Sequence, residues 1–468
     1  MIKPTEVSLT RIHASVAAKN YSYEQLMLDT LSTIRRLNPS VNAIVALQDE
    51  SELLAQARQA DQTPALGALH GIPMALKDLV NVAGIVSTFG SPLLKNSIPT
   101  KDDVIAERLR RAGAIIIGKT NTPEFGFGSQ TYNTVYGATA TPYDISKTSG
   151  GSSGGAAAAL ASGMVVVADG SDMMGSLRNP AAFCNVYGFR PTYGLVPNEP
   201  RGDIFMHQLA TLGPMARNIK DLAILLDVIA GPDRRHPHSL PVVSKFETAI
   251  KSTPKNNQRI GWLADWSGSY ATQPGVLQTC EKALAVFSDA GHQVEKIEAP
   301  FDRDNLWSAW IQLRSFAIVS LLGEVYNNEK QRAQLKPEAI YEIESGLALT
   351  VKDISNASAS RAQWFETAND LVSEYDVLVL PSSQVFPFDK TVHWPETING
   401  QIMETYHRWM EVVIPASLIG LPALNVPAGF SETGLPMGMQ LIGPRMSDTS
   451  LMQLAQQYHL ATQWPQQY

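Results

Sequence analysis

Two glycine clusters that contain serine lie close together in this sequence: Ser149-Gly-Gly-Ser152-Ser153-Gly-Gly155 and Asp169-Gly-Ser-Asp-Met-Met-Gly175-Ser176-Leu-Arg178-Asn-Pro180. Residues 111–190 hold 13 of the 33 glycines, whereas an even spread would put about six there. Because glycine weakens helices and strands, such a cluster is typical of tight turns or of a backbone that approaches a ligand closely. This region is therefore the first candidate for a functional site.

Length and composition limit the class of protein. The chain has 468 residues, a length typical of about three domains or of one large α/β enzyme domain. Hydrophobic residues make up 44% and charged residues 17%, which predicts a large buried core and excludes a mainly disordered chain. The net charge of −7 argues against a nucleic-acid binder that relies on positive charge. Two cysteines, Cys184 and Cys280, exclude a disulfide framework and a multi-cysteine zinc site.

Neither a signal peptide nor a membrane span is expected. Residues Met1–Arg11 lack an apolar segment followed by a small-residue cleavage site. No run of 18 apolar residues occurs, and the glycine- and alanine-rich region after Gly150 contains Asp169 and Asp172. We therefore expect a soluble, cytoplasmic protein that binds neither a membrane nor nucleic acid.

Segments typical of strands and of helices alternate along the chain. The first 60 residues predict helices, where Ser22 opens a capping-box pattern and Asn38-Pro39 is expected to end the helix that follows. Residues 102–113 predict a helix and residues 114–117 a buried strand. Further strands are predicted at 164–168, 259–263, 293–297, 377–380, 424–426 and 439–442, and helices at 156–161 and 276–290. This alternation indicates an α/β fold with a mixed, twisted β-sheet core covered by helices on both faces.

Two known sequence patterns occur in the glycine-rich region without the context they need. Gly113-Ala-Ile-Ile-Ile-Gly118-Lys119-Thr120 matches the phosphate-binding P-loop, but its middle residues are typical of a strand and no helix pattern follows. Gly151-Ser152-Ser153-Gly154-Gly155 matches the nucleophile elbow of α/β-hydrolases, but the polar segment 142–149 precedes it instead of an apolar strand. We interpret the first as a strand that ends in a turn. His236-Pro-His238 is too sparse for a metal site.

A third pattern is spread over three segments. Lys77 ends the apolar run Gly71-Ile-Pro-Met-Ala-Leu-Lys77, where an unpaired charge is costly, while Ser152 and Ser176 lie in the two glycine clusters. A serine hydroxyl becomes a nucleophile when a base takes its proton, and a lysine is such a base when burial lowers its pKa. Taken singly, the lysine is more typical of a snorkelling side chain and the serines of turn residues.

Together, these segments resemble the amidase signature family. The resemblance runs from Gly71-Ile-Pro to Gly443-Pro444 and is densest over residues 142–192. The matching motifs there are Pro142-Tyr-Asp, Gly150-Gly-Ser-Ser-Gly-Gly155, Gly175-Ser-Leu-Arg-Asn-Pro-Ala-Ala-Phe-Cys184 and Gly188-Phe-Arg-Pro-Thr192. The resemblance implies the amidase-signature fold in one domain over residues 1–468. Its expected parts are N-terminal helices at 1–60, a signature core at about 66–195, a surface excursion at about 231–256 and a C-terminal part to 468.

The resemblance also implies a role for each of three residues. Lys77 corresponds to the family's base, Ser152 to its bridging serine and Ser176 to its nucleophile. The implied reaction passes a proton from Ser176 through Ser152 to neutral Lys77 and leaves an acyl-enzyme on Ser176, which water hydrolyses. The implied oxyanion hole consists of the main-chain N–H groups of Met173, Met174, Gly175 and Ser176. No cofactor and no metal are expected.

One residue departs from the family pattern Thr-Asp-Thr-Gly-Gly-Ser. This chain has Ser171-Asp172-Met173-Met174-Gly175-Ser176, so Met174 replaces the first of the paired glycines. A methionine is strained at positive φ, and we therefore expect β or right-handed α geometry there. For Met173 and Met174 two interpretations stay open, the lining of an apolar pocket and ordinary core packing.

Family members differ in their substrates. Glutamine-using members, the A subunits of amidotransferases that correct misacylated tRNA, carry an Arg-Arg pair where this chain has Tyr341-Glu342. An acid at this place would repel the glutamine carboxylate, so a free-standing amidohydrolase is favoured. The alternative is the glutaminase-type A subunit of an amidotransferase, which works with partner subunits. A silent scaffold is disfavoured because the lysine and both serines are present.

Aromatic residues near the motifs indicate an aryl or apolar amide as substrate. Trp307, Trp310 and Arg314 recur at helical spacing, in a stripe that faces either the cleft or the core. The candidate substrate-binding residues are Phe125, Phe127, Gly128, Ser129, Tyr132, Trp307 and Trp310, with His407 and Trp409 as weaker ones. We expect a small-molecule amide as the binding partner and leave a homodimer open.

Overall fold

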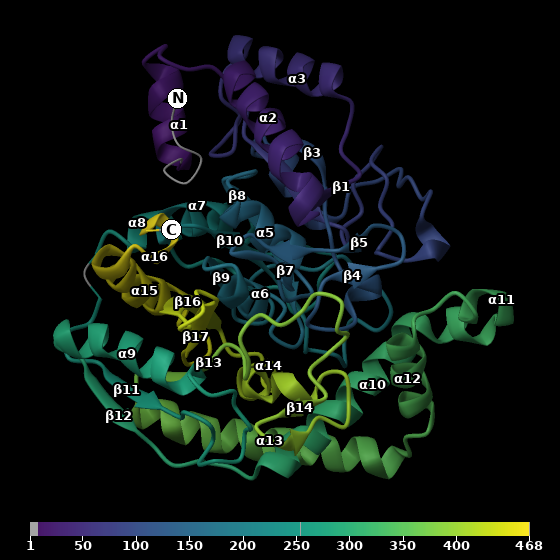
Figure 1. Ribbon diagram of the computed structural model, residues 1–468, viewed down its shortest axis with the longest axis vertical. Helices are drawn as coiled ribbons and strands as arrows, with labels where there is room; N and C mark the ends of the chain where they lie inside the picture. The colour runs from purple at the N-terminus through teal and green to yellow at the C-terminus, as the bar shows by residue number, and fades with distance from the viewer. Residues whose placement is uncertain (1–7, 253, 468) are drawn as a thin grey trace.

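An eight-stranded mixed sheet forms the centre of the computed structural model, which describes residues 8–252 and 254–467 (Figure 1). In chain order its strands are β8 (Val167–Asp172), β9 (Tyr187–Arg190), β10 (Thr211–Ala216), β11 (Arg259–Trp262), β12 (Gln293–Lys296), β13 (Val377–Pro381), β16 (Ala423–Phe430) and β17 (Pro436–Ile442). Their order across the sheet is β12-β11-β13-β17-β16-β9-β10-β8. β11 pairs in parallel with β12 and β13, and the other neighbours are antiparallel.

Helices cover both faces of this sheet. In β13, Val377 and Val379 pack into one hydrophobic cluster and Leu378 and Leu380 into another, as alternating side chains of a strand do. The first cluster includes buried residues of α7 (Ile219–Ile229), α9 (Val276–Asp289) and α15 (Asp448–Thr462). The second cluster includes buried residues of α6 (Arg178–Phe183), α10 (Arg303–Asn327), α13 (Val351–Glu374) and α14 (Ile414–Leu418). The fold predicted from the sequence, a mixed sheet with helices on both sides, is confirmed.

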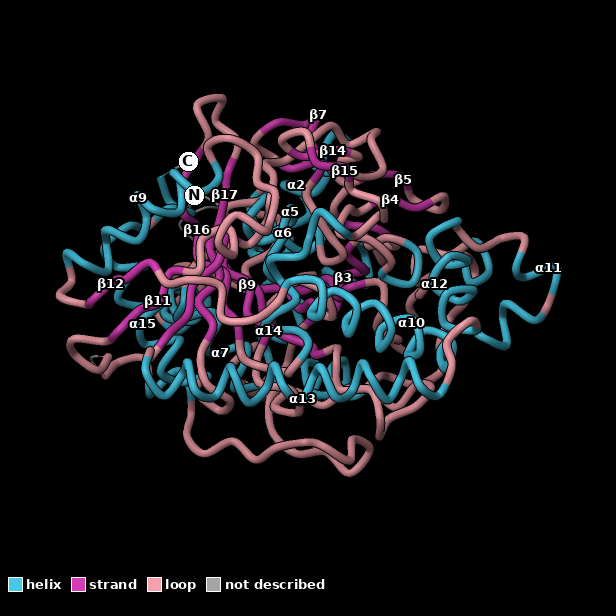
Figure 2. Tube along the Cα trace, turned by 90° about the horizontal axis from the view of Figure 1, so that it is seen from below, coloured by secondary structure: helices cyan, strands magenta, loops and turns pink. Residues whose placement is uncertain are grey.

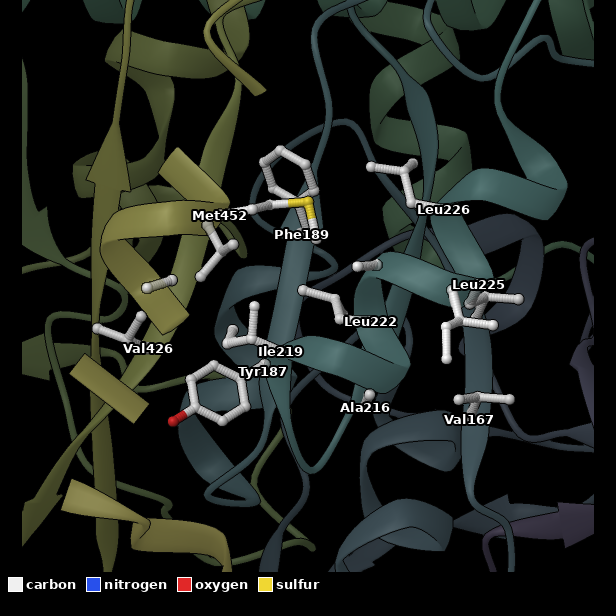
Figure 3. Close-up of a cluster of buried hydrophobic side chains, with 14 of the residues drawn as sticks. Val167, Tyr187, Phe189, Ala216, Ile219, Leu222, Leu225, Leu226, Val426 and Met452 are labelled. Atoms are coloured by element: carbon white, nitrogen blue, oxygen red, sulfur yellow. The ribbon is translucent and has the colours of Figure 1, made fainter. Parts of the chain in front are cut away.

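Figure 3 shows part of the first cluster, where side chains of α7 and α15 meet the sheet. Phe189 of β9 and Val426 of β16 lie near Leu222 and Met452 of these helices. Figure 2 shows α13 running across the lower part of the view, with α10 and α12 (Pro337–Leu347) towards one of its ends. These buried contacts join segments that are far apart in the sequence.

The N-terminal helices are α1 (Leu9–Ala17), α2 (Tyr23–Val41) and α3 (Glu50–Gln62), as predicted for the first 60 residues. The prediction that Asn38-Pro39 ends a helix is wrong, because Pro39 lies inside the last turn of α2. A proline there removes a single hydrogen bond, and the helix ends instead at Asn42, which adopts the left-handed conformation. The signal-peptide expectation for Met1–Arg11 falls largely on residues 1–7, outside the described residues.

A separate three-stranded sheet carries the candidate base. It consists of β1 (Ile44–Val45), β2 (Pro73–Lys77) and β3 (Ile115–Thr120), with β3 in the middle and parallel to β2. The P-loop-like residues lie largely in β3, after α4 (Val104–Arg111), which agrees with their interpretation as a strand. The main-chain N–H of Lys77, at the end of β2, donates to Asp169 Oδ1 of β8 at 3.0 Å. The two sheets therefore meet at the lysine.

The remaining elements are short. They are the helices α5 (Gly154–Ala161), α8 (Phe246–Ala249), α11 (Glu329–Arg332) and α16 (Trp464–Gln467), the 3-10 turns η2 (Pro92–Leu94), η3 (Glu124–Gly126) and η4 (Arg408–Val413), and the two-stranded pairs β4 (Tyr132–Asn133) with β5 (Gly137–Ala138), β6 (Ala140–Thr141) with β7 (Asp144–Thr148), and β14 (Thr397–Ile398) with β15 (Gln401–Ile402). The expected surface excursion at 231–256 contains α8, and its Phe246 and Ile250 are buried in the first cluster.

α10 is the one helix, among the residues described, that is long and apolar enough to cross a membrane by length and composition. Half of its most apolar window is buried inside the fold, and Trp310 near its centre is fully buried. Buried core helices meet the same criterion, and the packing of α10 against α12 and α13 accounts for its composition.

The contact between α10 and α12 predicts opposite outcomes for two helical glycines. A Cβ on Gly346 of α12 would lie 2.5 Å from Val319 Cγ2 and closer still to the Ser315 carbonyl oxygen, both on α10. A Cβ on Gly323 of α10 would meet only a side-chain carbon of Val319, at 3.7 Å. We expect Gly346→Ala to lower the free energy of unfolding by ~2 kcal/mol and Gly323→Ala to raise it by up to ~1 kcal/mol. Urea denaturation measures both, and equal effects of the two variants would contradict this helix contact.

Candidate active site

Lys77 is completely buried at the end of β2 and has no carboxylate within ion-pair distance among the described residues. Its Nζ contacts three hydroxyl oxygens, those of Ser152 at 2.8 Å, Ser153 at 2.8 Å and Ser171 at 2.9 Å. Burial lowers the pKa of Lys77 from about 10.5 to about 7, while the more distant negative charges of Asp169 and Asp172 act in the opposite direction. A substantial fraction of this lysine is therefore neutral near pH 7.

The three hydroxyl partners suit a neutral amine. A neutral lysine has two N–H donors and one lone pair, so it donates to two of the hydroxyls and accepts from the third. A hydroxyl that donates to this lone pair is in position to give its proton to the amine. The arrangement is therefore that of a base next to a serine.

Ser152 lies in the turn before α5, where the peptide bond between Gly151 and Ser152 is cis. The turn is held by the Gly151 N–H, which donates to Asn179 Oδ1 at 3.1 Å. The N–H of Ser153 donates to the main-chain carbonyl of Ser176 at 3.2 Å. The two glycine clusters of the sequence are thus in direct contact, with Ser152 and Ser176 on the wall of the same cavity.

Asp172 holds the loop that carries Ser176. It is the last residue of β8, and its carboxylate accepts hydrogen bonds from the N–H groups of Gly175 at 2.9 Å and Leu177 at 3.1 Å. Arg178 and Arg190 form ion pairs with it. Burial alone would raise the pKa of Asp172, but these two guanidinium groups hold it well below its usual range. The carboxylate is therefore a fixed, charged anchor for the turn.

Residues 173–176, here called the oxyanion loop after the role expected from the family resemblance, present main-chain N–H groups beside Ser176. Because the Gly175 N–H donates to Asp172, it is not available to an oxyanion, which corrects the predicted set of four. For the N–H groups of Met173, Met174 and Ser176, no acceptor occurs within the described chain. Gly175 takes the left-handed conformation, with φ of 77°, and Met174 does not have positive φ. The expectation for the backbone of Met174 is confirmed.

A cavity of about 590 Å³ opens in front of these residues. Four of the seven predicted substrate-binding residues line it, namely Phe125, Phe127, Gly128 and Ser129. Met173 and Met174 line it as well, so their pocket-lining interpretation holds, although Met174 also belongs to the second hydrophobic cluster. The remaining apolar wall comes from Leu79, Val80, Phe89, Leu94, Ile105, Ile204, Leu209, Ala210, Leu212, Ala317, Ile318, Leu321 and Leu322. The size and the lining are those of a site for a small, largely apolar molecule.

The other three predicted residues, Tyr132, Trp307 and Trp310, lie outside the cavity wall. The Tyr132 hydroxyl is bound to Glu338, and its ring stacks on His393 with centroids 4.8 Å apart. Trp307 packs under the guanidinium group of Arg408 at 4.3 Å. Trp310 is fully buried, and its Nε1–H donates to Met174 Sδ at 3.2 Å. The helical stripe therefore faces the core, apart from Arg314, which reaches the cavity.

Glu342 does not face the cavity as a free acid. Arg314 Nε donates to Glu342 Oε1 at 2.5 Å, and the Tyr406 hydroxyl donates to the same oxygen at 2.5 Å. Burial alone would raise the pKa of Glu342, but the charge of Arg314 lowers it below the usual value. The expected repulsion of a glutamine carboxylate by Glu342 is therefore wrong, because an arginine from another helix compensates the charge.

The sequence reasoning missed Ser153 and Ser171 as partners of Lys77, and Asp172 as the anchor of the oxyanion loop. Ser153 follows the candidate Ser152, and Ser171 lies in the second glycine cluster. A serine beside glycines is typical of a turn, so no signal in the sequence indicated that either hydroxyl contacts the lysine. Among residues 8–252 and 254–467, no group of three histidine, cysteine or acidic side chains is placed to hold a metal ion.

The amidase family profile matches residues 25–452. The chain belongs to the amidase signature family. It is accordingly an amidase-family enzyme, a hydrolase that acts on C–N bonds.

Relatives in this family include both hydrolases and amidotransferase subunits. The acylamidase of Rhodococcus erythropolis is 33% identical over 467 residues, which cover 98% of this chain and 96% of that protein. The A subunit of glutamyl-tRNA(Gln) amidotransferase from Picosynechococcus is 34% identical, covering 98% of this chain and 99% of that one. Among solved structures, a bacterial aryl acylamidase of the amidase signature family matches with a TM-score of 0.91 at 29% identity, covering 98% and 96%.

Replacing Lys77 by methionine should stabilise this amidase-family protein. Between the folded pKa of about 7 and the unfolded value of about 10.5, the unfolded chain binds the extra proton, so this group's contribution to the free energy of unfolding rises with pH. Lys77→Met removes that dependence, and we expect a gain of several kcal/mol near pH 7 that shrinks toward pH 10.5. Urea denaturation across this pH range measures it, with the exposed Lys352→Met as control. A pH dependence identical to that of the parent protein would show that Lys77 is charged in the folded state.

Proposed function

We propose that this chain hydrolyses a carboxylic amide with an aryl or other apolar group through an acyl-enzyme on Ser176. Ser152 and Lys77 form the proton relay. The observation that carries the proposal is the contact of buried Lys77 Nζ with Ser152 Oγ at 2.8 Å, in a cavity that Ser152 and Ser176 both line. A lysine with a pKa near 7 is matched to general base catalysis at neutral pH.

The reaction begins when neutral Lys77 takes the proton of Ser152 while Ser152 takes that of Ser176. Ser176 Oγ attacks the amide carbonyl, and the carbonyl oxygen becomes an oxyanion. The free N–H groups of Met173, Met174 and Ser176 stabilise this charge. Ser152 then gives a proton to the leaving nitrogen and regains one from protonated Lys77, the C–N bond breaks, and the amine departs. Water attacks the acyl-enzyme by the same relay and releases the acid.

The cavity supports an apolar substrate. Its wall is formed mainly by aromatic and aliphatic side chains, and a methionine pair stands next to the nucleophile. Burial of an aryl or alkyl group against such a wall stabilises the complex by roughly 25 cal/mol per Å² of apolar surface. The similarity to an acylamidase and to a solved aryl acylamidase agrees with this substrate class.

A second candidate function is that of the glutaminase-type A subunit of an amidotransferase, which works with partner subunits on misacylated tRNA. Its support is the 34% identity to such an A subunit over nearly the whole length of both chains. Arg314 on the cavity wall is a cation that a glutamine carboxylate could approach, although Glu342 already pairs with it. Glutamine turnover separates the two candidates.

The relay predicts different outcomes for two neighbouring serines. Ser152 and Ser153 both lie 2.8 Å from Lys77 Nζ, but the described cavity wall includes Ser152 and not Ser153. We expect Ser152→Ala to lower kcat for an anilide by about 10³-fold or more and Ser153→Ala by less than about tenfold. A fluorophosphonate probe should label Ser176 in the parent protein, and Ser176→Ala should abolish this labelling. Mass spectrometry of the peptide that contains residue 176 measures it. Equal losses in the two neighbouring variants would refute Ser152 as the bridging group.

Substrate choice is tested with the purified chain against anilides, short aliphatic amides and glutamine. We expect kcat/KM for the anilide to exceed that for glutamine by at least about 100-fold, because Met173 and Met174 beside Ser176 bury an aryl group, whereas Glu342 compensates the charge of Arg314 that would attract the glutamine carboxylate. Amine or ammonia release gives the rates, with Ser176→Ala as the blank. Preferential turnover of glutamine would reverse the order of the two candidates.

A further inference from the structure

The first half of the oxyanion loop lacks main-chain anchors. Within the described residues, neither Met173 nor Met174 makes a main-chain hydrogen bond to another main-chain group or to a side chain. The second half is fixed by Asp172, by the Gly175 carbonyl, which accepts from the Asn179 N–H at 2.7 Å, and by the Ser176 carbonyl. N–H groups that must be free to receive an oxyanion cannot also anchor the loop, so another contact has to hold it.

The side chains of these two methionines supply such contacts. The buried Nε1–H of Trp310 donates to Met174 Sδ at 3.2 Å, and Arg314 Nη1 donates to Met173 Sδ at 3.0 Å. Trp310 and Arg314 are four residues apart on α10, so they lie on the same face of the helix. Two consecutive residues of the loop therefore meet two consecutive turns of one helix.

Arg314 is itself rigidly held. Its Nε donates to Glu342 Oε1 at 2.5 Å, and its Nη2 donates to the Tyr406 hydroxyl at 3.1 Å. Glu342 belongs to α12, which packs closely on α10 at Gly346. A guanidinium group fixed by two partners presents its third nitrogen in a defined direction.

We propose that Trp310 and Arg314 are positioning residues that set the geometry of the oxyanion hole through the sulfur atoms of Met174 and Met173. This inference rests on the proposed function, because it assigns a use to the same oxyanion loop. Loss of either sulfur contact lets the free N–H groups of Met173 and Met174 move away from the place where negative charge develops. The effect falls on the transition state and therefore on kcat, with KM little changed.

The test is a double-mutant cycle between Trp310→Phe and Met174→Leu. Phenylalanine keeps an apolar ring without the N–H donor, and leucine keeps the apolar side chain without the sulfur acceptor. We expect each single variant to lower kcat for an anilide, and the rate of Ser176 labelling by a fluorophosphonate, by about five- to tenfold. The double variant should lose no more than either single one, because both remove the same contact. Met173→Leu should give a similar loss through Arg314.

Trp364→Phe is the matched control. Trp364 is buried in the same hydrophobic cluster, and its Nε1–H donates to the Pro415 carbonyl at 2.9 Å instead of to the oxyanion loop. It should lose comparable thermal stability and keep the parent kcat and labelling rate. Unchanged kcat in Trp310→Phe, or losses that multiply in the double variant, would overturn the inference.

Three further outcomes are distinguishable. If Trp310→Phe does not fold, Met174→Leu alone decides, since a parent-like labelling rate in that variant refutes the contact. If the parent protein neither cleaves amides nor is labelled at Ser176, the proposed function itself fails, and with it the positioning role. Labelling of the parent with no difference among the variants refutes only the positioning role.

Discussion

The burial of the Lys77 amine, with no carboxylate paired to it in the described part of the chain, is the constraint on which this site depends. A charged lysine in that position would be desolvated with hydroxyl groups as its close partners, which is costly, and the folded protein therefore favours the neutral amine. Such a lysine lowers the stability of the fold at neutral pH. The surrounding structure has to offset this cost, and the large core on both faces of the eight-stranded sheet is the means.

Asp172, the second buried ionisable group of the site, is held in its charged form. Asp172 is as deeply buried as Lys77, yet Arg178 and Arg190 compensate its charge and two N–H groups bind its oxygens. Burial of a carboxylate is tolerated when it is paired and hydrogen-bonded. The contrast agrees with the proposed relay, in which Lys77 as proton acceptor has to titrate near pH 7, whereas an anchor for a turn has to stay charged. Two buried ionisable groups of one site, Lys77 and Asp172, thus differ in pKa because their partners differ.

The sequence was sufficient for the features that local pattern determines. β-branched runs predicted β3 and β13, whereas the resemblance to the amidase signature family implied that Lys77, Ser152 and Ser176 share a site. Helical periodicity predicted that Trp310 and Arg314 share one face of a helix, but it did not predict what packs against that face. Trp310 is therefore a predicted substrate-binding residue, whereas in the structure it contacts Met174. Glu342 was misjudged for a similar reason, since its partner Arg314 lies 28 residues away on another helix. Contacts of this kind depend on tertiary packing, which spacing does not encode.

An acylamidase and an amidotransferase A subunit both match this chain over 98% of its length. The difference in substrate between such relatives therefore has to lie in residues outside the motifs that they share. In the proposed function such residues are Arg314 of α10, which lines the cavity, and Glu342 of α12, which lies behind the wall and pairs with it. An Arg314 neutralised by Glu342 and Tyr406 is part of the scaffold of an apolar cavity, whereas the same arginine without a partner would be a receptor for an anion. A single charge compensation between two helices can therefore change which molecules a common catalytic apparatus receives, without altering the lysine or either serine. It also links substrate choice to catalysis, because the guanidinium group that Glu342 holds in place is the one that contacts the oxyanion loop through Met173.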